Sequence, residues 1–238
     1  GRPGAICELL DRLQEIDGIR WIRILYAYPE RISDEFIAAM VRNTKVVPYL
    51  DLPIQHCDDA VLKAMNRRGG RKEIEDAIAR LRAAIPGITL RTTLIAGFPG
   101  ETEEQYAELC DFVKTVRFDR LGCFAYSAEE NTVAAKMPNQ IDEETKQRRA
   151  DHIMELQAEV SAEREGEKVG HTYECICDGV DDETGMYLLR TKADCPEIDG
   201  NVLTPADTPL ETGAFYKVTI TDSDTYDLYG YAEEKLED

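Results

Sequence analysis

The sequence predicts an α/β protein: the later part of a partial parallel (β/α) barrel, followed by a small all-β barrel. Apolar blocks of strand length recur over the first 165 residues, with amphipathic stretches between them. Only four such strand–helix units are visible, half of the eight that close a full barrel. After Gly166, short alternating segments separated by Gly- and Asp-rich turns replace the longer ones. We therefore predict two domains, residues 1–165, which end in a linker helix, and residues 166–238.

The four apolar blocks are rich in branched and aromatic residues. Their nearly continuous apolar character is typical of parallel strands that are covered on both faces. We predict these strands within residues 21–28, 46–54, 88–96 and 121–126.

Capping residues and apolar stripes mark the helices between these strands. Ser33 and Thr102 are suited to accept hydrogen bonds from the first free amide groups of a helix, and acidic residues follow each of them. Residues 71–85 carry apolar side chains spaced four, three and four apart, and Pro86 ends that stripe. We predict helices over residues 33–42, 58–65, 71–85, 102–116 and 142–167.

The second domain is strongly acidic. Residues 167–238 contain 18 acidic and 5 basic side chains, which gives a net charge of −13. Alternating segments predict strands over residues 171–177, 186–191 and 214–221. Several acids lie in or beside the predicted turns, where we expect them to be solvated: Asp178, Asp181, Asp182, Glu183, Asp194, Glu197 and Asp199.

The net charge of the whole chain helps to distinguish between nucleic acid and protein as its partner. Lys and Arg total 28 against 47 Asp and Glu, a formal net charge of −19. Because nucleic-acid affinity rests largely on cationic contacts, this balance disfavours RNA and favours a basic protein or a small ligand.

No apolar run is long enough for a membrane span, and no signal segment opens the chain, so we predict a cytoplasmic protein. The chain starts at Gly1 without a methionine, and we expect it to be part of a longer protein.

Seven cysteines, an odd number without a secretory signal, predict reduced thiols. Only Cys175 and Cys177 lie close in the sequence, and we interpret them as two buried thiols of one strand. No C-x2-C pair indicates a zinc site, and we predict no metal ligand. The other cysteines are Cys7, Cys57, Cys110, Cys123 and Cys195.

Ligands of parallel α/β sheets bind at the carboxyl ends of the strands, and the end of the third strand is the most informative. It runs into a turn that starts at Gly97, where the missing side chain lets a ligand approach the backbone. Ile95 and Phe98 would offer an apolar floor to a purine. Arg91 and Thr93 share one strand face, and Arg91 could bind a carboxylate through its planar fork. An ordinary β–α turn with a surface arginine fits the same residues equally well.

Three polar residues, Gln55, His56 and Cys57, follow the second strand. Gln55 could hold ribose hydroxyls. Adjacent residues of a strand point to opposite faces, so we interpret His56 as a structural histidine rather than a base for Cys57.

We interpret the one basic loop, residues 66–70, as the end of a helix. No residue is predicted to be catalytic.

Several stretches together resemble the radical S-adenosylmethionine methylthiotransferases, and among them the RimO-type branch that modifies a ribosomal protein. The resemblance covers nearly the whole chain. The matching stretches are residues 51–56, 61–68, 91–101, 117–127, 140–149, 194–200 and 224–230.

This resemblance implies that residues 1–165 are the later part of a radical-SAM barrel and that residues 166–238 are a TRAM-like barrel. It implies an enzyme that methylthiolates the β-carbon of an aspartate in the twelfth small-subunit ribosomal protein, with S-adenosyl-L-methionine and 4Fe-4S clusters as cofactors. Arg91 and Thr93 would help to hold the methionine end of the cofactor, Gln55 the ribose, and the segment from Ile95 through Gly97 to Phe98 the adenine. A net charge of −13 on the second barrel favours a basic ribosomal protein as its partner.

The chain also departs from the family. The C-x3-C-x2-C motif that anchors the family's cluster is absent, and so is the N-terminal domain with a second cluster. Asn131 and Val133 stand where the family has Gly and Pro, so the loop there is expected to differ in shape. We therefore expect no cluster in this chain and no activity from it alone. Two alternatives stay open: part of a transfer-RNA methylthiotransferase, or a noncatalytic protein-binding module.

Overall fold

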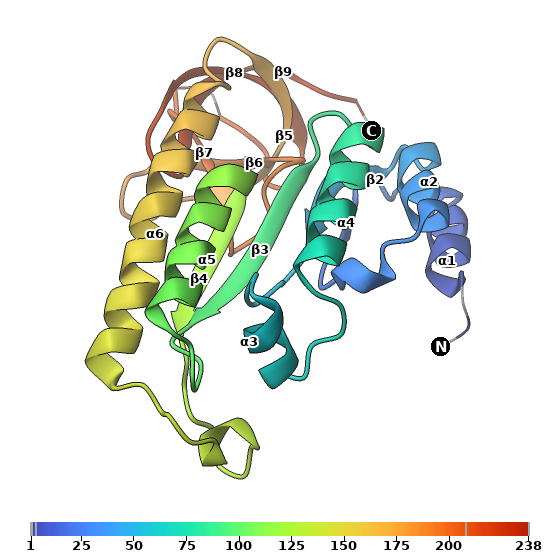
Figure 1. The fold of residues 1–238 in the computed structure, drawn as a ribbon. Coiled ribbons are helices and arrows are strands. Elements are labelled where there is room, and N and C mark those ends of the chain that lie inside the picture. The colour runs from blue at the N-terminus through green and yellow to red at the C-terminus, as the bar shows by residue number, and fades with distance from the viewer. Residues whose placement is uncertain (1, 3, 208, 238) are drawn as a thin grey trace. The chain divides into compact units, whose positions relative to one another are not determined.

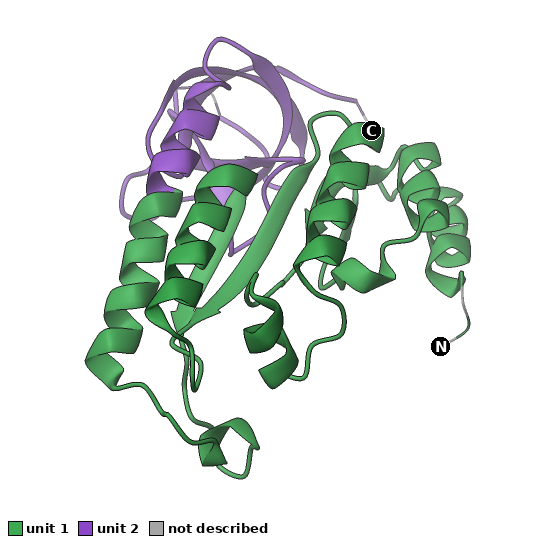
Figure 2. Cartoon of the chain, in the orientation of Figure 1, with its two compact units in different colours: residues 1–157 green, residues 158–238 purple. Residues whose placement is uncertain are grey.

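The computed structural model describes residues 2, 4–207 and 209–237. The chain divides into two compact units, Gly1–Gln157 and Ala158–Asp238, and the division falls inside one long helix, α6 (Figure 2). The predicted domain boundary after residue 165 lies near the end of the same helix. Among the described residues, no helix is both long and apolar enough to cross a membrane.

The first unit is a parallel sheet with helices between its strands (Figure 1). The four strands lie in the order β1-β2-β3-β4, and every neighbouring pair is parallel. This confirms the predicted partial barrel. The strands are β1 (Ile22–Ile24), β2 (Val46–Asp51), β3 (Thr89–Ala96) and β4 (Arg120–Ala125).

The helices begin at the capping residues that the sequence predicts. The Ser33 side chain accepts a hydrogen bond from the Phe36 amide (3.1 Å), and Thr102 accepts one from the Gln105 amide (3.3 Å). The structure adds a helix over the first residues that the sequence analysis does not predict. The α-helices are α1 (Ala5–Gln14), α2 (Asp34–Arg42), α3 (Asp59–Ala64), α4 (Arg71–Ala84), α5 (Glu103–Val116) and α6 (Glu143–Gly166), and two short 3-10 helices are η1 (Pro29–Arg31) and η2 (Ala134–Lys136).

One hydrophobic core joins the sheet of the first unit to its helices. Large side chains from every layer are buried in it, among them Leu10, Phe36, Leu50, Leu81, Leu94, Leu109, Phe118 and Ile153. Burial of this much apolar surface is the main favourable contribution to folding. The prediction of strands covered on both faces does not hold for β3, where buried and half-buried residues alternate. Its buried residues face the helices, and its half-buried residues form a second face of the sheet.

The second unit contains a closed five-stranded barrel in the order β5-β6-β7-β9-β8. The small all-β barrel is therefore confirmed. Its core includes Cys175 and Cys177 together with Leu189, Val202, Val218 and Leu228. Strands β7 and β9 are not predicted from the sequence, because β7 is only three residues long and Gly230 interrupts the apolar pattern of β9. The strands are β5 (Thr172–Val180), β6 (Tyr187–Thr191), β7 (Val202–Thr204), β8 (Phe215–Ser223) and β9 (Leu228–Lys235).

Candidate functional site

The carboxyl ends of β1, β2 and β3 share a backbone feature. Tyr26, Gln55 and Gly97 follow these strands with φ values of 59°, 71° and 76°, in the left-handed region. This conformation is uncommon for residues other than glycine, and strained residues cluster at ligand sites. Backbone bonds continue past the sheet, since the Gln55 amide donates to Thr93 O (2.9 Å) and the Ile95 amide donates to Gln55 O (2.8 Å). Gln55 is thereby fixed beside the end of β3.

The half-buried face of β3 carries Arg91, Thr93 and Ile95, as the alternation of side chains predicts. In the register with β4, Thr93 lies opposite Gly122, and Ile95 lies opposite Phe124, which is 61% exposed. We call Gln55, Thr93, Ile95 and Phe124 the edge set. Phe124 is not predicted as a site residue, although its position in the apolar block of the fourth strand could have indicated it.

Arg91 lies apart from the edge set. It is six residues before Gly97, which corresponds to roughly 20 Å along an extended strand. Its Nη1 atom is 3.6 Å from Oδ1 of the buried Asp51, its register partner on β2. This placement favours Thr93, Ile95 and Gln55 over Arg91 as contacts for a ligand at the carboxyl edge.

Phe98 is buried instead of presented to a ligand. It is only 5% exposed, and its ring packs edge-on against Tyr126, with ring centres 5.2 Å apart. Together with Val61 of α3 these two rings form a small apolar cluster, and Ile95 packs against it. Of the two residues predicted to form an apolar floor, Ile95 therefore lies on the half-buried face, while Phe98 supports it from the cluster.

A group of buried charged side chains holds the turn between β3 and α5. Glu101 accepts a hydrogen bond from the Gly97 amide through Oε2 (3.0 Å), and Arg149 of α6 donates to its Oε1 (2.6 Å). His56 Nε2 lies 3.4 Å from the same Oε2, while His56 Nδ1 accepts from the Asp58 amide (2.9 Å). His56 thus fits the structural role interpreted from the sequence. The contact of Glu101 with Arg149 is not predicted from the sequence, because 48 residues separate the two.

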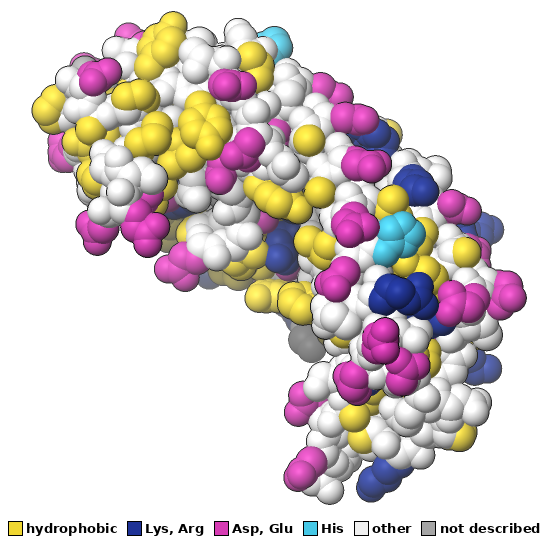
Figure 3. All heavy atoms as spheres, turned by 90° about the vertical axis from the view of Figure 1, so that its left-hand side faces the viewer, with side chains coloured by type: hydrophobic (Ala, Val, Ile, Leu, Met, Phe, Trp, Pro, Cys, Tyr) yellow, Lys and Arg dark blue, Asp and Glu magenta, His cyan; other side chains and the backbone are white. Residues whose placement is uncertain are grey.

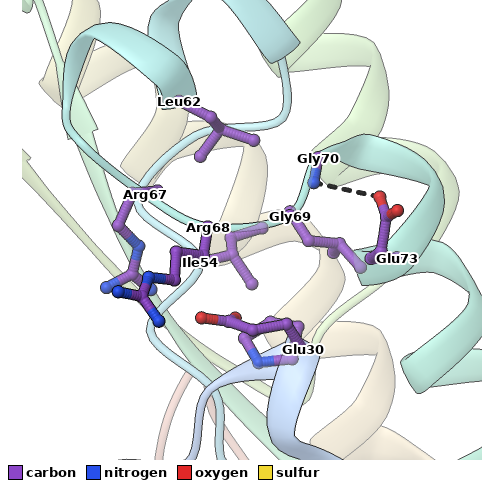
Figure 4. A pocket seen from close by; sticks show the side chains of 10 residues that line it. Glu30, Ile54, Leu62, Arg67, Arg68, Gly69, Gly70 and Glu73 are labelled. Carbon is purple, nitrogen blue, oxygen red and sulfur yellow. Dashed lines mark hydrogen bonds between the residues drawn. The ribbon is translucent and has the colours of Figure 1, made fainter.

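The basic loop at residues 66–70 encloses only a small cavity (Figure 4). Arg67 donates to the carbonyl oxygen of Pro53, and its guanidinium lies 4.8 Å from the centre of the Tyr28 ring. The cavity volume is about 10 Å³, so it holds at most about one water molecule. Asn66 follows α3 with φ of 57°, as expected for the end of a helix.

The cysteines do not form a site for a cluster. Within the described residues, no group of three His, Cys, Asp or Glu side chains is placed to hold a metal ion. Burial raises the pKa of the Cys57 and Cys123 thiols to about 12, and it raises the pKa of Cys175 and Cys177 as well. Iron binds thiolates, so these pKa shifts also oppose ligation. The residues present do not fit a 4Fe-4S cluster.

We expect the chain alone to bind no stoichiometric cluster after anaerobic incubation with iron and sulfide. The measurement is iron and acid-labile sulfide per chain, with the absorbance near 400 nm as a second readout. A full-length methylthiotransferase with the three-cysteine motif, treated in parallel, is the positive control. About four irons per chain in our protein would contradict the prediction.

Known families match both units of the chain. The model of the radical SAM superfamily matches residues 4–113, and the TRAM domain matches residues 169–232. The ribosomal protein uS12 methylthiotransferase RimO of Bdellovibrio bacteriovorus is 47% identical over 224 residues, which are 94% of this chain and 49% of that protein. The protein of the same name from Lachnoclostridium phytofermentans is 47% identical over 226 residues, 95% of this chain and 51% of that protein. The chain spans about half the length of the curated relatives it matches.

A solved structure has a similar fold. Coproporphyrinogen III oxidase (HemN) from Escherichia coli, a radical SAM enzyme, matches with a TM-score of 0.55 and 21% identity. The match covers 66% of this chain and 37% of that one. At this identity the likeness concerns the fold alone.

Proposed function

We propose that the chain is part of a radical S-adenosylmethionine methylthiotransferase of the RimO type, and that it supplies the nucleoside-binding wall and the substrate-docking barrel of an enzyme that methylthiolates ribosomal protein uS12. The proposed acceptor is the β-carbon of an aspartate. A ribosomal protein as substrate agrees with the predicted cytoplasmic location. The relatives' names support the proposal, since each describes a uS12 methylthiotransferase.

The observation that carries this proposal is the edge set at the carboxyl end of β3. S-adenosyl-L-methionine, when bound, would supply a sulfonium whose cleavage begins the radical chemistry of the family. Gln55 and Thr93 offer hydrogen-bonding groups for its ribose, while Ile95 and Phe124 offer apolar surface for its adenine. The left-handed Gly97 leaves the backbone open to the ligand. Arg91 would act farther from the edge, where it pairs with Asp51.

The proposed reaction has no step on a cluster held by the described part of this chain, since its cysteines do not fit one. By this proposal the chain alone is inactive and supplies binding and orientation. The cluster would have to be held by another part of a complete enzyme.

A chimera tests the proposal. The part of the Bdellovibrio relative that this chain does not match is joined to the present chain, and the product is reconstituted with iron and sulfide. We expect it to add one methylthio group to purified uS12, detected by mass spectrometry at a single aspartate. The relative itself, treated in parallel, is the control. A folded, iron-loaded chimera that leaves uS12 unmodified while the control modifies it would refute the proposed function.

The second barrel is proposed to dock the basic substrate. Acidic side chains spread over the whole face in Figure 3 instead of gathering in one patch, so we expect them to act mainly as a long-range field. Not all of the acids expected in turns are solvated. Asp194 is 2% exposed and accepts hydrogen bonds from the Thr191 amide (3.0 Å) and hydroxyl (2.6 Å). Asp182, Glu183 and Glu197 are exposed and available.

Neutralising these three acids should weaken the binding of uS12. The variant Asp182→Asn/Glu183→Gln/Glu197→Gln of the full chain is expected to bind about tenfold less tightly at low salt, because exposed charge pairs contribute roughly 0.2–1 kcal/mol each. The difference should shrink at 0.15 M salt, where the Debye length is about 8 Å. Calorimetry at two salt concentrations measures both effects.

The matched control removes three exposed acids from the first unit, as Glu130→Gln/Glu144→Gln/Glu155→Gln. It changes the net charge equally and is expected to weaken binding less than twofold. Equal losses in both variants would show that net charge alone matters. Salt-sensitive binding of transfer RNA without binding of uS12 would favour the transfer-RNA branch instead.

A further inference from the structure

We propose that the first half of α6 positions the ligand-facing turn between β3 and α5, with Arg149 and Lys146 as positioning residues. This inference rests on the proposed function, because the turn starts at Gly97, beside the edge set. Both side chains are nearly completely buried, although each carries a charge and belongs to a helix with a charged outer face. Such side chains need a specific reason to be buried.

Arg149 contacts both the turn, through Glu101, and the start of α5, through Glu103. It donates from Nη1 to Glu101 Oε1 (2.6 Å) and to the Glu101 carbonyl oxygen (3.2 Å), and from Nη2 to Glu103 Oε1 (2.7 Å). Its guanidinium also lies 5.2 Å from the centre of the Tyr106 ring. A planar, five-donor group is suited to several acceptors in fixed directions, and a lysine at this position could not replace it.

Glu101 passes this constraint to the end of β3. One carboxylate oxygen receives Arg149, and the other accepts the Gly97 amide at 3.0 Å, with His56 Nε2 at 3.4 Å. The orientation of the carboxylate therefore fixes the position of the Gly97 amide. Since Gly97 directly follows Ala96, it also sets where the backbone turns away from Ile95.

Lys146, which lies one helical turn before Arg149 in α6, contacts the ends of both β3 and β4. Its ammonium donates to the Tyr126 carbonyl oxygen just after β4 (3.2 Å) and pairs with Glu143. Its side chain packs so closely on Gly97 that a Cβ atom there would lie 2.3 Å from Lys146 Cγ. The loop before α6 adds a further bond, from the Gly100 amide to Asn139 O (3.0 Å). The ends of β3 and β4 are thus both attached to this helix.

The energetics favour a geometric role over a stabilising one. A buried ion pair is often no more stable than apolar residues of the same size, whereas removal of one partner alone costs several kcal/mol. A variant that lacks both charges can therefore regain the stability that is lost when Arg149 alone is replaced, while the turn at Gly97 remains without its orienting contact. Glu101→Gln/Arg149→Met is such a variant, because the glutamine oxygen can still accept the Gly97 amide.

The experiment compares four versions of the full chain: wild type, Arg149→Met, Glu101→Gln/Arg149→Met, and Arg148→Met. Arg148 is the matched control, since it is exposed on the same helix and reaches Glu103 only at 3.8 Å. S-adenosyl-L-methionine is titrated against 15N-labelled protein, a method that also measures weak binding. Thermal unfolding of each version and hydrogen exchange at the Gly97 amide are measured in parallel.

We expect Arg149→Met and the double variant to bind the cofactor at least tenfold more weakly than wild type, at a temperature where all are folded. The double variant should regain most of the lost thermal stability, and Arg148→Met should bind within twofold of wild type. Recovery of affinity together with stability in the double variant would overturn the inference. Unchanged hydrogen exchange at the Gly97 amide in Arg149→Met would also overturn the inference, and this readout does not depend on cofactor binding. Absence of cofactor binding by wild type would instead count against the proposed function.

Discussion

Replacement of Gly200 by alanine is expected to open the second barrel. A Cβ atom at this position would lie 1.9 Å from the carbonyl oxygen of Tyr226 and 2.8 Å from its carbonyl carbon. Both neighbours are backbone atoms, so no side-chain movement relieves the clash. The two segments must separate, and the bond from the Leu228 amide to Asn201 O (2.9 Å) would break with them.

This contact matters because it lies where β7 meets β9. The two strands are parallel neighbours through Val202 and Leu228, and both side chains belong to the barrel core. Overpacking costs roughly 1–3 kcal/mol, and lost backbone hydrogen bonds add about 1 kcal/mol each. A barrel of about 70 residues has little stability to spare. We therefore expect a loss of about 3 kcal/mol or more.

Hydrogen exchange read by mass spectrometry checks this result. Gly200→Ala should lose protection in peptides from β5 to β9, while peptides from β3 and β4 should keep theirs. Gly166→Ala is the control, because a Cβ atom there meets nothing within 4 Å and the residue is helical. It should stabilise the chain by up to about 1 kcal/mol. Wild-type protection throughout the barrel in Gly200→Ala would show that the backbone yields more easily than we infer.

The local signals in the sequence were sufficient for most of the first unit. Ser33 and Thr102 mark helix starts because their hydroxyls serve amides only three residues away, and the stripe over residues 71–85 needs only helical periodicity. The helix at Ala5–Gln14 lacks such a cap, since Gly4 precedes it without a capping side chain. In the barrel, β9 was missed because an inward position is held by Gly230, whose Cβ atom would lie 2.5 Å from Thr219 O.

The candidate site was predictable only where it depends on one strand. The alternation of β3 places Arg91, Thr93 and Ile95 on one face, and the sequence alone indicates this. The exposure of a residue in the following turn depends on which distant side chains pack on it. Phe98 is buried because Tyr126 and Val61 pack against it. The contact of Arg149 with Glu101 joins α6 to the turn before α5 across 48 residues and leaves no local pattern.

Replacement of Gly97 by alanine is expected to cost much more stability than the same change at Gly100. Both residues are left-handed, with φ of 76° and 84°, so both variants carry a similar backbone strain of about 1 kcal/mol. They differ in their surroundings. A Cβ atom on Gly97 would lie 2.3 Å from Lys146 Cγ and 3.1 Å from Lys146 Cα, whereas one on Gly100 meets nothing within 4 Å.

The difference between the two variants therefore isolates the contact of the turn with α6. Overpacking adds roughly 1–3 kcal/mol, so we expect Gly97→Ala to lose about 3 kcal/mol and Gly100→Ala about 1 kcal/mol. Denaturant unfolding followed by the fluorescence of Trp21, the single tryptophan, measures both. In Gly97→Ala/Lys146→Ala the Cγ atom is gone, so part of the loss should return and the two changes should be non-additive. Equal losses for Gly97→Ala and Gly100→Ala, with additive behaviour of the double variant, would mean that α6 does not constrain the turn.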